Sequence, residues 1–331
     1  MKTLQEIVKC GDEESLLQLT SVPDSLILDI EENVTEEISP LQFAIESKQF
    51  GIAKILLNHF KVDPSHDNSS ALRTSVKSGD VSVLQLLLQD SRVDAFRALD
   101  AACGNGNKNL VEMLLTNYNV NPSSHDNSAL SSACFGGHID LVKMLLDDPR
   151  VDPSLALEAA CCGGHTDIVT LLLNHPQVDP ARDDQRALKT ACEYGFPDVV
   201  KALLQDSRVD PAAAFPDACY NGNMELVELL YPHVKNPSLA INSACYGGNI
   251  EVVKFLLNDT RVDPSYDDNT AIRTACEYGF VDIIELLLKD DRVDPCAANN
   301  EALTMARLRE QNEVVGLLEN DRRVKAKMSV K

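Results

Sequence analysis

Residues 129–146 read Ala-Leu-Ser-Ser-Ala-Cys-Phe-Gly-Gly-His-Ile-Asp-Leu-Val-Lys-Met-Leu-Leu, and this stretch decides the fold. Small apolar residues up to Cys134 have helical spacing, and Gly136-Gly137 ends that helix because glycine is the usual residue past a helix end. From Ile139 to Leu146 a second apolar stripe follows the i, i+3, i+4, i+7 pattern of one helix face. The unit is therefore predicted to be a helix, a tight turn and a second helix.

The same unit recurs along the chain behind a marker, Arg-Val-Asp-Pro or a relative of it. The Asp or Asn of the marker recurs at intervals of 31, 27, 31, 27, 31, 26, 27 and 31 residues. One unit has too little apolar surface to fold alone, so neighbouring units must stack to share a core. The chain is predicted to be an all-α solenoid of about eleven stacked helix pairs. The marker residues are Asp63, Asp94, Asn121, Asp152, Asp179, Asp210, Asn236, Asp263 and Asp294.

At this point the sequence resembles the ankyrin-repeat family. Ser39-Pro40-Leu41-Gln42-Phe43-Ala44 is close to the family's Thr-Pro-Leu-His-x-Ala, and Gly137-His138…Leu145-Leu146 and Gly164-His165…Leu171-Leu172 follow its Gly-His and Leu-Leu pattern. The resemblance implies an ankyrin-type α-solenoid with an extended concave face that binds proteins. Three family positions differ: the first-helix Pro, the first-helix His and the Gly that ends the second helix. The Pro is replaced by Ala71, Ala129, Ala187 and Ala271. The His is replaced by Arg73, Ser131, Lys189 and Arg273. The Gly is replaced by Ser91, Pro149, Pro176 and Thr260.

Units of two lengths are present, and they differ where the ankyrin family has a projecting β-hairpin finger. Nine residues separate Asp63 from Leu72 in a long unit, whereas five separate Asp152 from Leu157 in a short one. The long units carry Asn and Asp there, which tolerate the left-handed conformation of a tight tip. We expect short β-hairpin fingers on the longer repeats only. The tip residues are Asp67-Asn68, Asp126-Asn127, Asp183-Asp184, Asp267-Asp268 and Asn299-Asn300, and the units without fingers begin at Asp94, Asp152, Asp210 and Asn236.

The two ends are predicted to cap the stack. Residues 1–28 form an N-terminal capping helix pair, 29–293 the ankyrin-like repeats, 294–324 a C-terminal capping repeat and 325–331 a basic tail. Arg307 occupies a position where inner repeats have Cys, which suits a surface that no further repeat covers. The tail is expected to be a frayed, solvated end, with a targeting or docking element as the alternative.

Charge and apolar run length restrict the partners. Thirty Lys and Arg against 51 Asp and Glu give a net charge of −21, which repels nucleic acid and anionic membranes. Apolar runs are far shorter than the ~20 residues that span a bilayer. We therefore expect one or more protein partners, no nucleic acid, no membrane, a monomeric state and a cytoplasmic location, with the nucleus as the alternative.

Seven of the ten cysteines occupy one position, directly after an Ala of the first helix. Stacked repeats lie ~10 Å apart, whereas a disulfide needs Cα atoms within about 7 Å. The spacing does not suit metal ligands either, so these residues are predicted to be reduced, buried thiols in the core. We call them the slot cysteines: Cys103, Cys134, Cys161, Cys192, Cys219, Cys245 and Cys276.

No catalytic or metal-binding pattern stands out. There is no Gly-x-Ser-x-Gly elbow and no phosphate-binding Gly-Lys-Ser/Thr. Loops such as Arg150-Val151-Asp152 offer too few oxygens for calcium, so helix capping and local pairing with Arg are predicted instead. His138 and His165 are expected to brace the turn between the two helices. The sequence therefore predicts no enzymatic activity, no cofactor and no metal.

Aromatic residues concentrate at the end of the first helix. Phe135, Tyr220 and Tyr246 directly follow a slot cysteine, and Tyr194 and Tyr278 lie one position later. Aromatic side chains are common anchors of protein interfaces, so these five are predicted to contact the partner. The alternative is that they only pack against neighbouring turns. His66 and His125, in the expected finger tips, complete the candidate partner-binding set.

These features favour a non-catalytic protein-binding scaffold that uses the concave face of the solenoid. The alternative is an adaptor or inhibitor that delivers or occludes a client of a ubiquitin ligase or kinase.

Overall fold

The computed structural model describes residues 8, 10–19, 40–58, 62, 64, 66–79, 81–90 and 92–328. Contacts divide the chain into two compact units, Met1–Ala159 and Ala160–Lys331. Several predicted features lie outside the described residues. They are most of residues 1–9 and all of 20–28 in the expected N-terminal cap, Ser39, Asp63, Ser91, the side chain of His66, and residues 329–331 of the tail.

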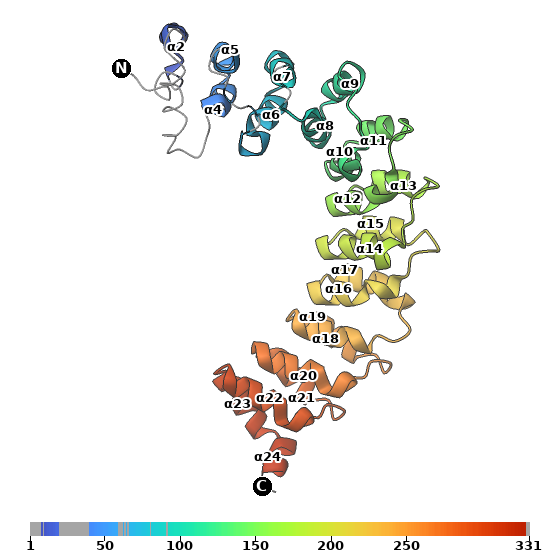
Figure 1. Ribbon diagram of the computed structural model, residues 1–331. Coiled ribbons are helices and arrows are strands. Elements are labelled where there is room, and N and C mark those ends of the chain that lie inside the picture. The colour runs from blue at the N-terminus through green and yellow to red at the C-terminus, as the bar shows by residue number, and fades with distance from the viewer. Residues whose placement is uncertain are drawn as a thin grey trace. The chain divides into compact units, whose positions relative to one another are not determined.

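Each unit is built from successive helix pairs (Figure 1). The first unit contains α2 (Glu13–Leu19), α4 (Pro40–Glu46), α5 (Phe50–Asn58), α6 (His66–Ser78), α7 (Val81–Leu88), α8 (Ala95–Gly104), α9 (Lys108–Thr116), α10 (Ser124–Phe135), α11 (Ile139–Leu146) and η1 (Pro153–Leu155), and α12 (Ala156–Gly163) crosses the boundary. The second unit contains α13 (Thr166–Leu173), α14 (Arg182–Tyr194), α15 (Pro197–Leu203), η2 (Pro211–Ala213), α16 (Phe215–Asn221), α17 (Met224–Leu230), η3 (Tyr231–His233), α18 (Ser238–Tyr246), α19 (Ile250–Leu257), α20 (Tyr266–Tyr278), α21 (Val281–Leu288), α22 (Ala297–Leu308), α23 (Asn312–Asn320) and α24 (Arg322–Met328).

The helices of the second unit form two layers. First helices of successive pairs pack side by side, α16 against α14 and α18, and α20 against α18 and α22. The second helices form their own row, with α15 against α13 and α17, and α21 against α19 and α23. This arrangement confirms the predicted all-α solenoid of stacked helix pairs within the unit.

The slot cysteines lie in the core between these layers. Cys192, Cys219, Cys245 and Cys276 are completely buried, as are apolar residues of the second helices such as Leu230. All ten cysteines of the chain are free thiols. A small apolar side chain fits this position because the two helix layers approach closely there.

The left-handed tips are present, but the predicted β-hairpin fingers are wrong, since the described residues contain no strand. Each long unit with a described tip instead has three consecutive residues with φ between 47° and 64°, inserted at the start of the first helix. Left-handed residues place the chain in a tight helical loop, which leaves no extended segment for strand pairing. The three-residue tips are His125–Asn127, Asp183–Gln185, Asp267–Asn269 and Ala298–Asn300.

The short units have no left-handed tip between the marker and the first helix. The carboxylate of Asp94 accepts a hydrogen bond from the backbone N–H of Phe96, and Asp152 and Asp210 cap η1 and η2, which begin with Pro. Asn236 accepts a hydrogen bond from the backbone N–H of Ser238. These side chains replace the missing intrahelical acceptors of the first turn.

The basic C-terminus is ordered up to Met328, where a frayed end was expected. Arg322–Met328 form α24, and the side chain of Val324 is buried. Arg323 donates to Asp321 and to the backbone carbonyls of Leu288, Asp290 and Val293. The helix that contains tail residues 325–328 therefore contributes hydrogen bonds and apolar contact to the last repeats, and Lys327 of the tail itself donates to the backbone carbonyl of Cys296.

Candidate protein-binding surface

The tyrosines predicted to bind a partner lie on the surface of the second unit. Tyr220 and Tyr246 directly follow buried slot cysteines, and one residue along a helix rotates the side chain by ~100° away from the core. The exposed fractions of Tyr220, Tyr246 and Tyr278 are 46%, 51% and 43%. About half of each ring surface is thus left for contact with another molecule.

Three of these tyrosines and one phenylalanine form a continuous row, which we call the aromatic row: Tyr220, Tyr246, Tyr278 and Phe280. Centroids of the Tyr220 and Tyr246 rings are 5.6 Å apart, and those of Tyr246 and Tyr278 are 5.1 Å apart. Tyr278 stacks on Phe280 at 6.0 Å. Offset and edge-on contacts at these distances are favourable for aromatic rings. The rings therefore pack against neighbouring rings and also remain exposed. Their environment fits packing against neighbouring turns and leaves surface free for contact with a partner.

The other predicted site residues do not join the row. Tyr194 is 55% exposed, and its hydroxyl is hydrogen-bonded to the Cys162 thiol, which raises the pKa of the tyrosine. In the first unit, Phe135 is exposed and His125 stacks on Phe96 with centroids 4.6 Å apart. Sequence reasoning missed Phe280, which follows the turn glycine and packs over Gly248 of the preceding repeat.

Turn residues position the row by bonding to the preceding repeat. The Nδ2 atom of Asn249 donates to the backbone carbonyls of Cys219 and Tyr220, the end of the previous first helix. In the first unit, Nε2 of His138 lies 3.0 Å from the carbonyl oxygen of Gly104, so His138 braces the turn of the repeat before it. Unpaired carbonyls at helix ends need such partners, and these bonds fix the spacing of successive helix ends.

A shallow groove of about 320 Å³ runs beside the aromatic row. Its walls come from three successive first helices, α16, α18 and α20. Tyr220 and Tyr246 form its aromatic side, and Asp217 contributes a half-buried carboxylate. Burial raises the pKa of Asp217. The positive charge of Lys189 partly opposes this increase, and the negative charge of Glu193 adds to it. The remaining lining residues are Pro216, Asn242, Ser243, Thr270 and Thr274.

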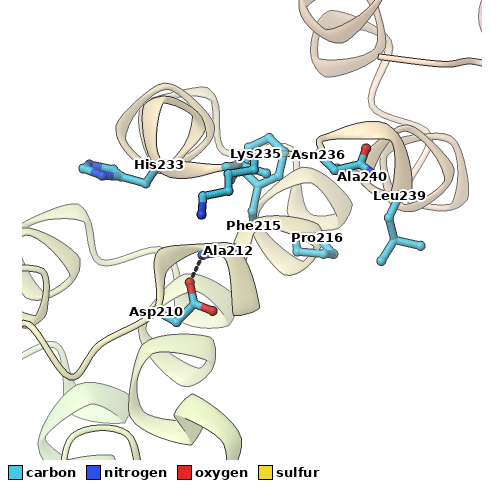
Figure 2. Close-up of a pocket in the computed structure, with 10 residues that line it drawn as sticks. Asp210, Ala212, Phe215, Pro216, His233, Lys235, Asn236, Leu239 and Ala240 are labelled. Atoms are coloured by element: carbon cyan, nitrogen blue, oxygen red, sulfur yellow. Dashed lines mark hydrogen bonds between the residues drawn. The ribbon is translucent and has the colours of Figure 1, made fainter. Parts of the chain in front are cut away.

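A second pocket, of about 350 Å³, lies where the two consecutive short units begin. Figure 2 shows Lys235 extending over Phe215, with Leu239 at the edge and Asp210 bonded to the backbone of Ala212. Pro216 lines both this pocket and the groove, so the two hollows adjoin along α16 and α18. No left-handed tip interrupts the surface here, because both units are short.

The loops carry a repeated pairing of Asp with Arg, as the sequence indicated. Arg208 and Arg261 each bind the Asp two residues earlier, with N–O distances of 2.6 and 2.8 Å, and the Arg partner lowers the pKa of Asp206. Sequence reasoning missed a second contact. The Nη1 atoms of Arg208 and Arg261 also donate to the carbonyls of Val178 and Val234 in the preceding loops. The same contact recurs from Arg292 to Val262 and from Arg323 to Val293.

No helix among the described residues combines the length and apolar character that crossing a membrane requires. The family model described as "Ankyrin repeats (3 copies)" matches residues 92–155, 150–214, 216–299 and 241–327. No curated protein shows a significant match to the chain. Ankyrin repeats act in general as scaffolds for protein–protein interaction. The family match covers most of the chain, and the stacked helix pairs and turn glycines agree with it, so this protein belongs to the ankyrin-repeat family.

Proposed function

We propose that the protein is a non-catalytic scaffold that holds a client protein on the first-helix surface of its second unit. The observation that carries the proposal is the aromatic row, whose tyrosines stay half exposed while they contact one another across three repeats. Aromatic rings that are held by neighbours lose little conformational freedom on binding. Tyr220 and Tyr246 are the central anchors, because they also line the groove.

The two consecutive short units support this location. Long units place a left-handed tip at the start of the first helix, whereas the units that begin at Asp210 and Asn236 have none. A client segment has access along α16 and α18 from the pocket at Lys235 to the groove at Tyr220. Exposed Leu239 offers an apolar contact between the two hollows.

Affinity capture from cells of the native host tests this proposal. Wild-type protein, the double variant Tyr220→Ala/Tyr246→Ala and the control Tyr266→Ala are used as baits, and captured proteins are quantified by mass spectrometry. Tyr266 is a suitable control because it is 39% exposed and lies outside the aromatic row and the groove. We expect a set of proteins that the control retains and the double variant loses. Identical capture by all three baits contradicts the proposed surface.

A further inference from the structure

The groove beside the aromatic row combines one anion, several hydrogen-bond acceptors and two aromatic rings. Asp217 on α16 is half buried and, among the described residues, makes no ion pair and no side-chain hydrogen bond. Lys189, the cation that acts on Asp217, already binds Asp184 at 2.6 Å, and Arg273 on α20 binds Glu301 and Thr270. A partly desolvated carboxylate whose nearby cation is paired with another carboxylate favours a cationic ligand.

Asn242 provides an independent sign of a missing donor. Its Oδ1 atom is buried and has no hydrogen-bond partner within the described part of the chain, although the residue lines the groove. Buried polar atoms are nearly always paired in native proteins. A donor in the groove, met by rotation of the amide, would satisfy this oxygen.

The other polar groups of the groove are hydroxyls that can accept hydrogen bonds. Those of Ser243 and Thr274 have no partner among the described residues, whereas the Thr270 hydroxyl is already engaged, since it donates to the backbone carbonyl of Asp267 and accepts from Arg273. Tyr220 and Tyr246 add ring faces that attract cations. The acceptors are spread over three helices, so the best ligand is a flat cation with several donors.

We propose that this groove is a subsite for an arginine side chain carried by a basic segment of the client. A guanidinium has five donors in one plane and stacks on aromatic rings, whereas an ammonium is a compact and strongly hydrated charge. The net charge of −21 draws basic segments toward the protein. This inference rests on the proposed function, since it names the chemistry by which the same surface would recognise its client.

A peptide titration followed by NMR tests the subsite directly. Three acetylated, amidated peptides Gly-Ser-X-Ser-Gly are used, in which X is arginine, lysine or citrulline, the neutral isostere of arginine. We expect the arginine peptide to shift amide signals of Asp217, Tyr220 and Tyr246 and to bind at least about fivefold more tightly than the other two. Equal affinity for arginine and lysine, or for arginine and citrulline, overturns the proposal.

Two isosteric variants locate the interaction. Asp217→Asn removes the charge and Thr274→Val removes a hydroxyl, and we expect Asp217→Asn to weaken the arginine peptide by about tenfold or more. Glu228→Gln is the matched control, because it removes an exposed charge from α17 in the other helix layer. The subsite is refuted if Glu228→Gln weakens binding of the arginine peptide as much as Asp217→Asn does, or if Asp217→Asn does not weaken it. Either result shows only a general attraction of the peptide to an acidic protein.

The same experiments separate this inference from the proposed function. Loss of client capture in Tyr220→Ala/Tyr246→Ala, without preference for the arginine peptide, keeps the binding surface and refutes the arginine subsite. Selective arginine binding that depends on Asp217, with unchanged client capture in the double tyrosine variant, supports the subsite and refutes the client surface.

Discussion

The rings of Tyr246 and Tyr278 meet edge to face with their centroids 5.1 Å apart, although they belong to different repeats. Each of the two tyrosines follows the buried end of the first helix of its own repeat. Tyr220 is the neighbour of Tyr246 in the row, and its helix end is held by hydrogen bonds from Asn249 to the carbonyls of Cys219 and Tyr220. The repeat spacing therefore sets the spacing of the rings. The aromatic row forms only when repeats stack, since no single repeat contains two of these tyrosines.

Tyr220→Ala and Tyr246→Ala should each weaken client binding by about 1–3 kcal/mol, because each removes a pre-positioned aromatic anchor. Helicity, measured by far-UV circular dichroism, should change little, since the rings are half exposed. Binding is measured by titration calorimetry with a client identified by affinity capture. A lowered melting temperature with unchanged affinity would assign the rings to packing alone.

The slot cysteines should react slowly with a thiol reagent in the native protein and rapidly after unfolding, whereas exposed Cys10 should react at once. Cys192→Asp should destabilise the fold by about 2–5 kcal/mol, because it places an unpaired charge in the core. Cys192→Ala should have a milder effect, measured by urea unfolding. Fast reaction of all ten thiols in the native state would contradict their burial.

The buried thiols should also make stability fall at alkaline pH. Burial, with a smaller contribution from Asp217, raises the pKa of Cys192 from 9.0 to about 12. Between these values the unfolded state has lost the proton and the folded state retains it, so the free energy of unfolding decreases as pH rises. Each such thiol contributes a slope of up to about 1.4 kcal/mol per pH unit. Cys192→Ala should show a shallower decline than wild type in urea unfolding between pH 9 and 11.

Arg323→Lys should destabilise the protein by about 1–3 kcal/mol, because a lysine cannot reproduce the bonds to Asp321 and to three backbone carbonyls. The neighbouring residue is the control. The side chain of Arg322 is 80% exposed, against 21% for Arg323, and it pairs with Asp291, which is 85% exposed. Arg322→Lys should change stability by less than about 0.5 kcal/mol in thermal unfolding. Equal effects of the two substitutions would show that α24 does not anchor the last repeats.

Two glycine substitutions should act in opposite directions. A Cβ atom at Gly247 would lie 2.0 Å from the carbonyl oxygen of Tyr220, so Gly247→Ala should cost about 1–3 kcal/mol by forcing neighbouring repeats apart. Gly316 lies inside α23, where such an atom would meet no other part of the protein within 4 Å beyond its chain neighbours and the helix's own backbone. Gly316→Ala should therefore stabilise the protein by about 0.5–1 kcal/mol, as alanine does in a helix interior. Chemical denaturation of both variants measures the difference.

The repeat fold was predictable because it depends on local, recurring signals. The position of Cys219 after Ala218 and the break at Gly222 recur in each of the seven units from Cys103 to Cys276, and both follow from helix periodicity and turn chemistry. The β-hairpins were wrong because Asp183 and Asp184 signal left-handed backbone, and that signal alone does not distinguish a hairpin tip from a left-handed loop at a helix start.

The position of the exposed tyrosines was predictable, but the groove beside them was not. Tyr220 and Tyr246 stand out by position, whereas Asp217 and Asn242 are ordinary polar helix residues in the sequence. They become a groove only when adjacent repeats are placed side by side. One sequence signal was available: the two consecutive short intervals that begin at Asp210 and Asn236, where the left-handed tips are missing.

The arginines that bind the preceding loop give the second unit a direction. Arg208, Arg261, Arg292 and Arg323 all donate toward the N-terminal neighbour. Removing the last helix deletes the donor for the carbonyl of Val293, and truncations one and two repeats earlier delete the donors for the carbonyls of Val262 and Val234. The series then stops, because the loop before Asn236 reads His233-Val234-Lys235 and contains no arginine. Loss of Arg323 should therefore destabilise first the repeat that precedes it, and through these contacts the effect should reach no further than the loop that contains Val234.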